Sequence, residues 1–499
     1  MRRYSKLLIV FFIILLGKLS GFFKDILITF YHGISSLTDA YFLSNSISSV
    51  LYMAVYSSIP IIVVPLYSRL LLSETKDGVA RKLSAVVSFF LIVSLCMAFL
   101  VLGAASWLVD FFSGEISEQV KKLTVSYISI MAFTFGISTL VSFFNALQTV
   151  NKIVMPSYVV PIVNNLVFCF GLYLFSATDD FDKVLMLGVL AWFILLVMNL
   201  FVSRKAFSFH MGEVLYCFFD RKFLFLFLPA VFAFYIEQIN GFVGVYFASE
   251  LGVGAISVFA YSNKLNMIFL SVFLVFLTAS LFPRIALISS RNDQVELANY
   301  LTKCVRYIVI YSVPLIIYIG FYSVDIVKLL FQRGSFIDQD VVKVASVFSV
   351  VLLALPFCLI RDIMNRVFFS YDNTLTPVLL SLTALSINFW LSYVFYQHYY
   401  LVGLATSMVI STIFNSLVVT FLVQRKIKLD LLVSGFKILL PCGICGVIAY
   451  CFLHLLHSVL ANYWLILFIP FALIYFLFLL LFKINEVWFL TNLLRGRFL

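Results

Sequence analysis

Charged residues are scarce in this chain. Only 11% of its 499 residues are Asp, Glu, Lys or Arg, and 63% are hydrophobic, whereas soluble domains are roughly a quarter charged and about half apolar. A soluble fold of this size must cover itself with polar surface, and this composition does not supply it. The composition therefore excludes a soluble enzyme, a nucleic-acid-binding module and a disordered scaffold. It predicts an integral membrane protein.

Cysteine is also sparse, with eight residues that lie almost all inside apolar stretches. Cysteines in such places behave as small apolar side chains, so we expect no disulfide framework. Cys442 and Cys445 form a C-x-x-C pair, but no His or acidic residue lies near them, and we expect no metal site there. The net charge of +11 is typical of basic cytoplasmic loops in a membrane protein, and it does not indicate a nucleic-acid partner.

The chain lacks the apolar–polar alternation, in stretches of about ten residues, that marks a membrane β-barrel. It has instead long stretches that are apolar all round, of about 20 residues or more, enough to cross the hydrocarbon core as helices. We therefore predict an all-α polytopic membrane protein. Its fourteen transmembrane helices are expected at residues 6–31, 39–67, 84–112, 123–148, 154–176, 184–203, 223–248, 254–283, 304–323, 343–369, 375–397, 401–424, 433–453 and 461–482.

The first apolar stretch is too long for a cleavable signal peptide and lacks a small-residue cleavage site, so we expect it to be retained. With a cytoplasmic N-terminus, the fourteen spans place 23 of the 34 basic residues in inside segments and 6 in outside segments. This bias follows the positive-inside rule. Both termini are therefore expected in the cytoplasm.

Features of the first six predicted helices recur about 220 residues later. The matched pairs include Gly21-Phe22 with Gly241-Phe242, and Ala40-Tyr41 with Ala260-Tyr261. An offset of six helices, an even number, gives both copies the same membrane orientation, and two parallel lobes suit alternating access. We predict two pseudo-symmetric six-helix lobes followed by two C-terminal helices and a cytoplasmic tail. Their boundaries are residues 1–205, 221–425 and 433–499.

Ionisable residues inside the predicted spans cost about 2.5–3.5 kcal/mol each on insertion scales, so they indicate functional sites. Lys18 in the first span and Lys264 in the eighth lie too deep to reach water easily, and we expect them to line a central cavity. Lys24 could pair with Asp39 to close the outer side. Fixed amines suit an anionic substrate such as a diphosphate head group, although organic anions or lipids would fit as well. Asn164 and Asn165 are expected to form hydrogen bonds between helices.

Five short motifs stand in order along the chain: Gly21–Asp25, Thr38–Phe42, Leu330–Phe336, Tyr371–Pro377 and Gly403–Ser407. Together they resemble the motifs of the MviN/MurJ family of lipid flippases, and the resemblance covers essentially the whole chain. It implies a flippase of the multidrug/oligosaccharidyl-lipid/polysaccharide superfamily in the bacterial inner membrane. Such a protein moves an undecaprenyl-pyrophosphate-linked saccharide from the cytoplasmic to the periplasmic leaflet by alternating access.

The resemblance also implies roles for residues. In the family, basic residues of the central cavity engage the diphosphate, and the last two helices form a groove for the polyprenyl tail. Carried over by motif, the substrate-binding residues are Lys18, Lys24, Asp25, Asp39 and Lys264. The three lysines stand where the family has arginines, and Tyr52 stands where it has another arginine. Lysine lacks the bidentate fork of arginine. These departures therefore favour an O-antigen or capsular repeat unit as the substrate. The peptidoglycan precursor lipid II stays as the alternative substrate.

A cation site in the second lobe is a further implication of the resemblance. Glu237, Asn388 and Thr406 could converge there from three spans. We expect no cofactor, and Na⁺ or H⁺ would be the coupling ion, unless the membrane potential acts directly on the transported charge. The chain is expected to act as a monomer.

Two other classes of function fit a polytopic membrane protein. A cation-coupled multidrug exporter of the same superfamily would normally stop at twelve helices and would need carboxylates in its cavity. A polyprenyl-linked glycan polymerase or glycosyltransferase needs catalytic carboxylates or a large outside loop, and the longest outside segment here, about residues 324–342, is short. The sequence therefore favours a transporter over an enzyme.

Overall fold

The computed structural model describes residues 2–153, 155–175, 180–204, 209–210, 217, 220–291, 293–371, 373–427, 431–460, 463–482 and 484. In this part of the chain every regular element is a helix, so the predicted all-α class is confirmed. The helices form two compact units. One consists of Met1–Ser257 with Phe331–Asp340, and the other of Val258–Leu330 with Val341–Leu499.

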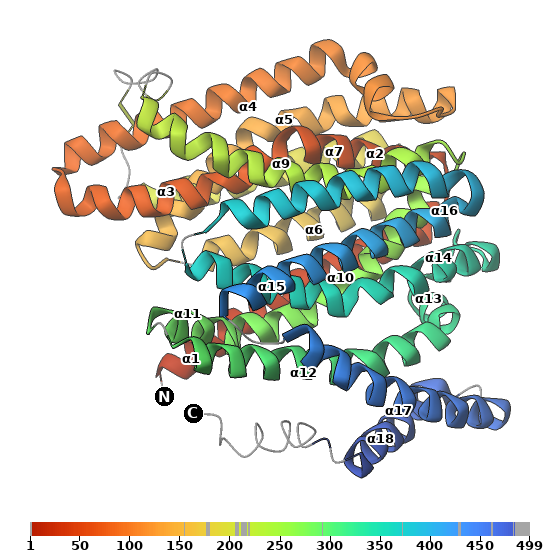
Figure 1. Ribbon diagram of the computed structural model, residues 1–499. Coiled ribbons are helices and arrows are strands. Elements are labelled where there is room, and N and C mark those ends of the chain that lie inside the picture. Colours follow the sequence, from red (N-terminus) through yellow and green to blue (C-terminus); the bar gives the residue numbers. More distant parts are fainter. Residues whose placement is uncertain are drawn as a thin grey trace. The chain divides into compact units, whose positions relative to one another are not determined.

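The first unit is built around α5 (Glu118–Val150), which packs against four other helices of the unit, α2, α3, α4 and α7. Figure 1 shows α4 and α5 lying side by side. A second layer forms where α6 packs against both α1 and α7. The remaining bounds are α1 (Arg2–His32), α2 (Ser36–Ser48), η1 (Ser49–Met53), α3 (Ala54–Ser73), α4 (Lys76–Phe112), α6 (Met155–Phe175), α7 (Phe181–Ser203) and α9 (Arg221–Ser249).

One continuous helical path, from Ser36 to Ser73, comprises α2, η1 and α3. It begins with a capping box, in which the Ser35 N–H donates to Thr38 Oγ1 at 2.9 Å and the Thr38 N–H donates to Ser35 Oγ. These two bonds satisfy backbone donors that have no partner inside the helix. The η1 segment in the middle is a π-helix, whose wider turn shifts the side chains that follow it.

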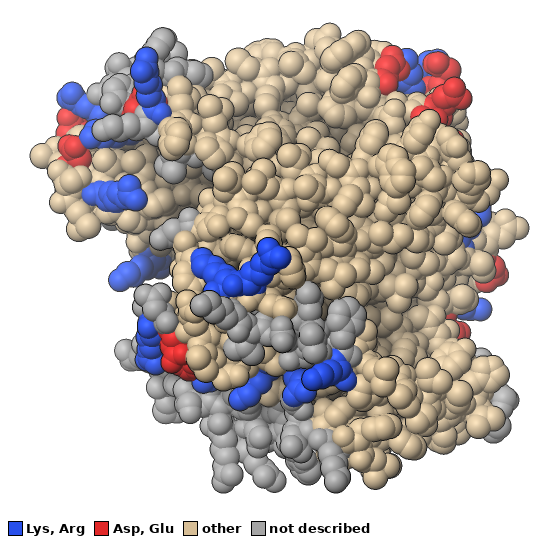
Figure 2. All heavy atoms as spheres, viewed as in Figure 1, with Lys and Arg blue, Asp and Glu red and all other residues tan. Residues whose placement is uncertain are grey.

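The charged residues of α4 lie at its two ends. In α4, four charged residues occupy the first two turns and Asp110 lies in the last turn, while positions 83–109 carry none. Figure 2 shows charged side chains gathered at both ends of α4, with an uncharged surface between them. This is the pattern of a helix whose ends reach water and whose middle lies in hydrocarbon.

The second unit contains a helix pair, α12 and α17, and α18 packs against both. The Tyr475 hydroxyl of α18 donates to the carbonyl of Ile310 in α12 at 3.1 Å. The bounds are α10 (Ala255–Ser280), which begins in the first unit, α11 (Phe282–Ser290), α12 (Gln294–Phe321), α13 (Ser323–Phe331), α14 (Asp338–Val351), η3 (Leu352–Ala354), α15 (Leu355–Ser370), α16 (Leu375–Ile427), α17 (Leu431–Leu460) and α18 (Trp464–Leu481).

Eleven helical segments of the described chain are long and apolar enough to cross a membrane, which confirms a multi-pass helical membrane protein. The 53-residue α16 counts once among them, although Tyr400, with a φ of 51°, interrupts it between the predicted spans 375–397 and 401–424. Two predicted spans, those in α1 and α10, are not among the eleven. The count of fourteen, the lobe boundaries 1–205 and 221–425, and the cytoplasmic location of the termini therefore stay predictions.

Candidate functional site

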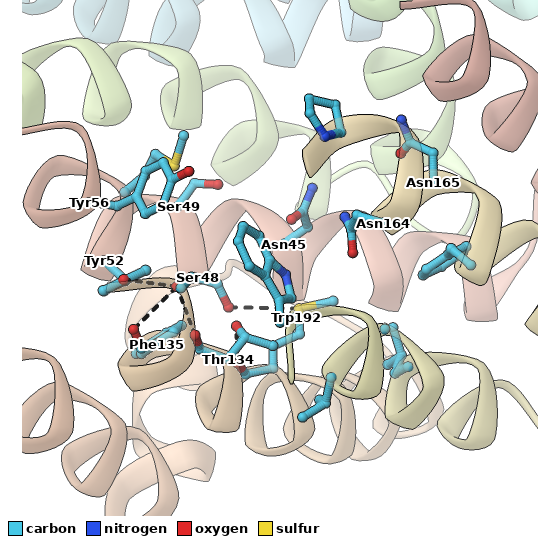
Figure 3. A pocket seen from close by; sticks show the side chains of 18 of the residues that line it. Asn45, Ser48, Ser49, Tyr52, Tyr56, Thr134, Phe135, Asn164, Asn165 and Trp192 are labelled. Carbon is cyan, nitrogen blue, oxygen red and sulfur yellow. Dashed lines mark hydrogen bonds between the residues drawn. The ribbon is translucent and has the colours of Figure 1, made fainter. Parts of the chain in front are cut away.

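A polar cavity of about 420 Å³ lies in the first unit, between α1, the α2–η1–α3 path, α5, α6 and α7. Figure 3 shows amide, hydroxyl and aromatic side chains from these helices around it. Among the described residues that line it, Lys24 is the one charged side chain, and there is no carboxylate. The polar and aromatic lining consists of Lys24, Tyr41, Asn45, Ser48, Ser49, Tyr52, Tyr56, Thr134, Phe135, Ser138, Asn164, Asn165, Phe168 and Trp192.

Lys24 reaches the cavity from α1. Its Nζ lies 5.2 Å from the ring centroid of Phe168 on α6, a cation–π distance. One turn earlier on α1, the Ser20 hydroxyl accepts a hydrogen bond of 3.2 Å from the Asn165 amide. The predicted interhelical role of Asn165 is thereby confirmed. These two contacts hold α1 against α6 and keep the ammonium group at the cavity wall.

The α2–η1–α3 path supplies a stripe of polar and aromatic side chains. Asn45, Ser48, Ser49, Tyr52 and Tyr56 follow one another at intervals of one to four residues and all line the cavity. Spacings of three and four keep side chains on one face of a helix. The π-helical η1 segment lies in the middle of this stripe, and such segments occur frequently at functional sites.

Tyr52 has a structural role that the sequence did not indicate. Its hydroxyl is hydrogen-bonded to Ser138 Oγ at 2.9 Å and to Thr139 Oγ1 at 2.7 Å, both on α5. Its ring stacks on Phe135, with centroids 4.4 Å apart. Thr139 in turn is 2.5 Å from the hydroxyl of Ser94 on α4. Tyr52 therefore fastens the π-helical segment to α5 while one edge of its side chain faces the cavity.

Asp39 lies outside the residues that line the cavity. Its carboxylate accepts hydrogen bonds from the backbone N–H groups of Gly254 and Ser257, the latter at 2.8 Å, and from the Ser257 hydroxyl at 2.5 Å. These donors form the N-terminus of α10, which begins at Ala255. An acid at this position satisfies free backbone donors and complements the helix dipole. Asp39 is thus bonded to the start of α10 rather than to Lys24.

The other three predicted substrate residues are placed apart from this cavity. Asp25 is buried in α1, whereas Lys18 on the same helix is exposed. Lys264 is half-buried on α10, in the second unit. Of the five residues, the structure therefore brings Lys24 to the cavity wall, and substrate contacts by the others stay predictions.

The three candidates for a cation site are divided between the two units. Glu237 is exposed on α9, while Asn388 and Thr406 lie on α16. Asn388 is buried, and its amide oxygen is 3.5 Å from the Ser392 hydroxyl, which meets Ser407 at 2.7 Å. The bond between Ser392 and Ser407 joins the two halves of α16, on either side of Tyr400. In the described chain, no group of three or more His, Cys, Asp or Glu side chains is placed to hold a metal ion.

A second cavity, of about 380 Å³, lies in the second unit between α12, α15, α16 and α17. Its polar side chains are three hydroxyls, those of Ser312, Ser416 and Thr420, and the rest of its lining is apolar. Such a lining suits a hydrocarbon chain rather than a charged group. The main apolar residues are Val305, Val309, Val313, Ile316, Leu353, Phe357, Ile360, Val409, Ile413, Leu417 and Leu439.

Sequence reasoning missed most of the uncharged lining of the first cavity. Asn45, Tyr56 and Trp192 are uncharged, so no insertion penalty of a charge draws attention to them. The available signal was the helical spacing of polar residues after Asn45. Asn164, predicted to hydrogen-bond between helices, lines the cavity instead.

A family model described as "Lipid II flippase MurJ" matches residues 28–475 of the chain. The protein named "Probable lipid II flippase MurJ" from Aquifex aeolicus (strain VF5) is 25% identical over 378 residues, which cover 73% of this chain and 72% of the relative. The protein of the same name from Buchnera aphidicola subsp. Schizaphis graminum (strain Sg) is 23% identical over 451 residues, 85% of each chain.

Two solved structures resemble the fold. One, titled "Lipid II flippase MurJ, inward closed conformation", has a TM-score of 0.82 at 20% identity and covers 95% of this chain and 98% of its own. An inward-facing multidrug resistance MATE family transporter of the MOP superfamily has a TM-score of 0.69 at 14% identity, covering 83% and 94%. At these identities the likeness shows the fold alone.

Proposed function

The chain belongs to the MurJ family of lipid II flippases, and from this premise we propose that it moves lipid II from the cytoplasmic to the periplasmic leaflet of the bacterial inner membrane. Membership of the family makes it a membrane transporter rather than an enzyme. The comparisons support lipid II as the cargo. None of them supports the O-antigen or capsular unit that the lysine and tyrosine departures favoured.

The observation that carries the proposal is the position of Lys24. A single ammonium group at the wall of a polar cavity without carboxylates attracts an anion and repels a cation. A diphosphate offers several oxygens to such a point charge. A cationic drug would meet a like charge there, which argues against the multidrug exporter.

The apolar cavity of the second unit supports the lipid part of the proposal. A prenyl chain placed there would contact the aliphatic side chains of α12, α16 and α17. Burial of hydrocarbon against hydrocarbon requires no compensating hydrogen bond. We assign the prenyl tail to this lining, in a protein that works as a monomer by alternating access.

Coupling to Na⁺ or H⁺ through Glu237, Asn388 and Thr406 is part of the proposal. Its support is the buried amide oxygen of Asn388, a ligand type that Na⁺ accepts. Flipping by the purified protein in vesicles should depend on a gradient of one of these ions. Equal rates in the absence of both gradients would contradict the coupling and leave the cargo assignment standing.

Complementation in two bacterial strains tests the cargo. One strain is depleted of its own lipid II flippase, and the other lacks its O-antigen flippase. We expect this chain to restore growth of the first strain and to leave the second without O-antigen. Rescue of only the second strain, with expression confirmed in both, would contradict lipid II as the cargo.

A further inference from the structure

The cavity of the first unit has two chemically different ends. At one end the Lys24 ammonium group lies over Phe168, which contacts Phe181 with ring centroids 6.1 Å apart. At the other end the Trp192 indole meets the ring of Tyr56 edge-on at 6.3 Å. Phe181 and Trp192 are eleven residues apart on α7, so the two ends are about 16 Å apart along the helix axis.

The cavity wall between and beside these ends offers unused hydrogen-bonding groups. Asn45 on α2 is exposed to the cavity, and Asn164 on α6 and Trp192 on α7 are partly exposed to it. Within the part of the chain that the structure describes, neither amide side chain nor the indole N–H has a hydrogen-bond partner, in contrast to Asn165. Figure 3 shows these three side chains directed into the same space from three helices.

This combination suits a neutral, hydroxyl-rich ring. An aromatic face packs against the C–H face of a sugar, and amides both donate to and accept from hydroxyl and acetamido groups. A purely apolar ligand would leave the amides unpaired, which costs binding free energy. The absence of carboxylates among the described lining residues gives a cation no counter-ion.

We propose that Trp192, Asn45 and Asn164 form a saccharide subsite, which binds the N-acetylated sugars of the lipid-linked cargo while Lys24 holds the diphosphate. This inference rests on the proposed function and deepens it, because it assigns the sugar and the phosphates to different side chains of one cavity. Trp192 supplies the stacking surface, and the two asparagines supply the directional contacts.

Binding of two lipids with the same prenyl chain tests the subsite: lipid II, and undecaprenyl diphosphate, which carries no sugar. Dissociation constants are measured by isothermal titration of the full-length protein in detergent micelles. The Trp192→Leu variant should bind lipid II about tenfold more weakly and undecaprenyl diphosphate as the unaltered protein does. Asn164→Ala should show the same selectivity, whereas Lys24→Gln should weaken binding of both lipids.

Phe193→Leu is the matched control, since Phe193 is the next residue on α7, is exposed and is not among the residues that line the cavity. It should bind both lipids normally. Equal weakening of both lipids by Trp192→Leu, or no effect on either, would overturn the subsite and leave the proposed function intact. If the unaltered protein binds neither lipid, the proposed function itself fails and the subsite with it.

Discussion

The carboxylate of Asp39 accepts a hydrogen bond of 2.8 Å from the backbone N–H of Ser257, although the two residues are 218 positions apart in the chain. The same carboxylate also accepts hydrogen bonds from the N–H of Gly254 and from the Ser257 hydroxyl. Asp39 therefore caps the N-terminus of α10, as an N-cap side chain would, although it comes from a distant part of the chain. This buried acid, to which the family resemblance assigns a role in substrate binding, joins α2 to a distant helix.

Replacing Asp39 should weaken this junction. Asp39→Ala removes the acceptor for three hydrogen bonds and should cost about 1–2 kcal/mol of stability, as loss of an N-cap does. Asp39→Asn keeps one amide oxygen and should lose less. The midpoint of thermal unfolding in detergent measures both. Glu115→Gln, at an exposed acid near the end of α4, is the control, and equal midpoints for all three variants would contradict the capping role.

The Tyr52 hydroxyl should contribute more to the stability of the protein than the hydroxyl of Tyr56, which lies four residues later. Tyr52→Phe removes the group bonded to Ser138 and Thr139, and we expect a loss of about 1–2 kcal/mol. Tyr56→Phe should be close to neutral, because the described chain offers the Tyr56 hydroxyl no partner. Chemical unfolding of the two variants side by side provides the comparison. A Tyr56→Phe loss as large as that of Tyr52→Phe would count against the anchoring role.

Replacing Gly334, in the segment Phe331–Asp340, should destabilise the protein. Gly334 has a φ of 59°, and a Cβ there would overlap the carbonyl oxygen of Phe30, which accepts a 2.9 Å hydrogen bond from the Ser335 N–H. Gly334→Ala should therefore cost more than the roughly 1–2 kcal/mol of a left-handed alanine.

A comparison with Gly252 separates the steric part of this cost from the conformational part. Its φ is 90°, but no atom lies within 4 Å of a Cβ built there. Gly252→Ala should lose only the conformational term, so its unfolding temperature should stay above that of Gly334→Ala. The reverse order would show that the contact between Gly334 and the end of α1 contributes nothing.

Sequence reasoning found residues whose chemistry is conspicuous in a membrane. Lys24 and Asp39 were identified because a charge in an apolar span is costly, and both have specific partners in the structure. The partner of Asp39 was not predictable, since no local pattern links it to a residue more than 200 positions later. Asn45 and Trp192 were missed because uncharged side chains carry little insertion penalty, and only the packing of several helices places them at one cavity.

Transport should depend on the positive charge at position 24 rather than on the size of the side chain there. Lys24→Arg keeps a cation at the cavity wall and matches the residue of the family motif, so it should support growth of a strain depleted of its lipid II flippase. Lys24→Gln should lower the flipping rate at least about tenfold, since a charge-assisted contact is worth about 1.5–3 kcal/mol. Lys122→Gln, at an exposed lysine of α5, should behave as the unaltered protein. Full growth with Lys24→Gln would remove Lys24 from the transport route.

The most direct test of the account is the amount of lipid II that reaches the outer leaflet. In cells depleted of their own flippase, a hydrolase that cannot cross the membrane cleaves only the lipid II exposed on the periplasmic face. Expression of this chain should restore cleavage, and Lys24→Gln at equal expression should not. If lipid II stays protected from the hydrolase while the unaltered protein is present in the membrane, the chain does not flip lipid II.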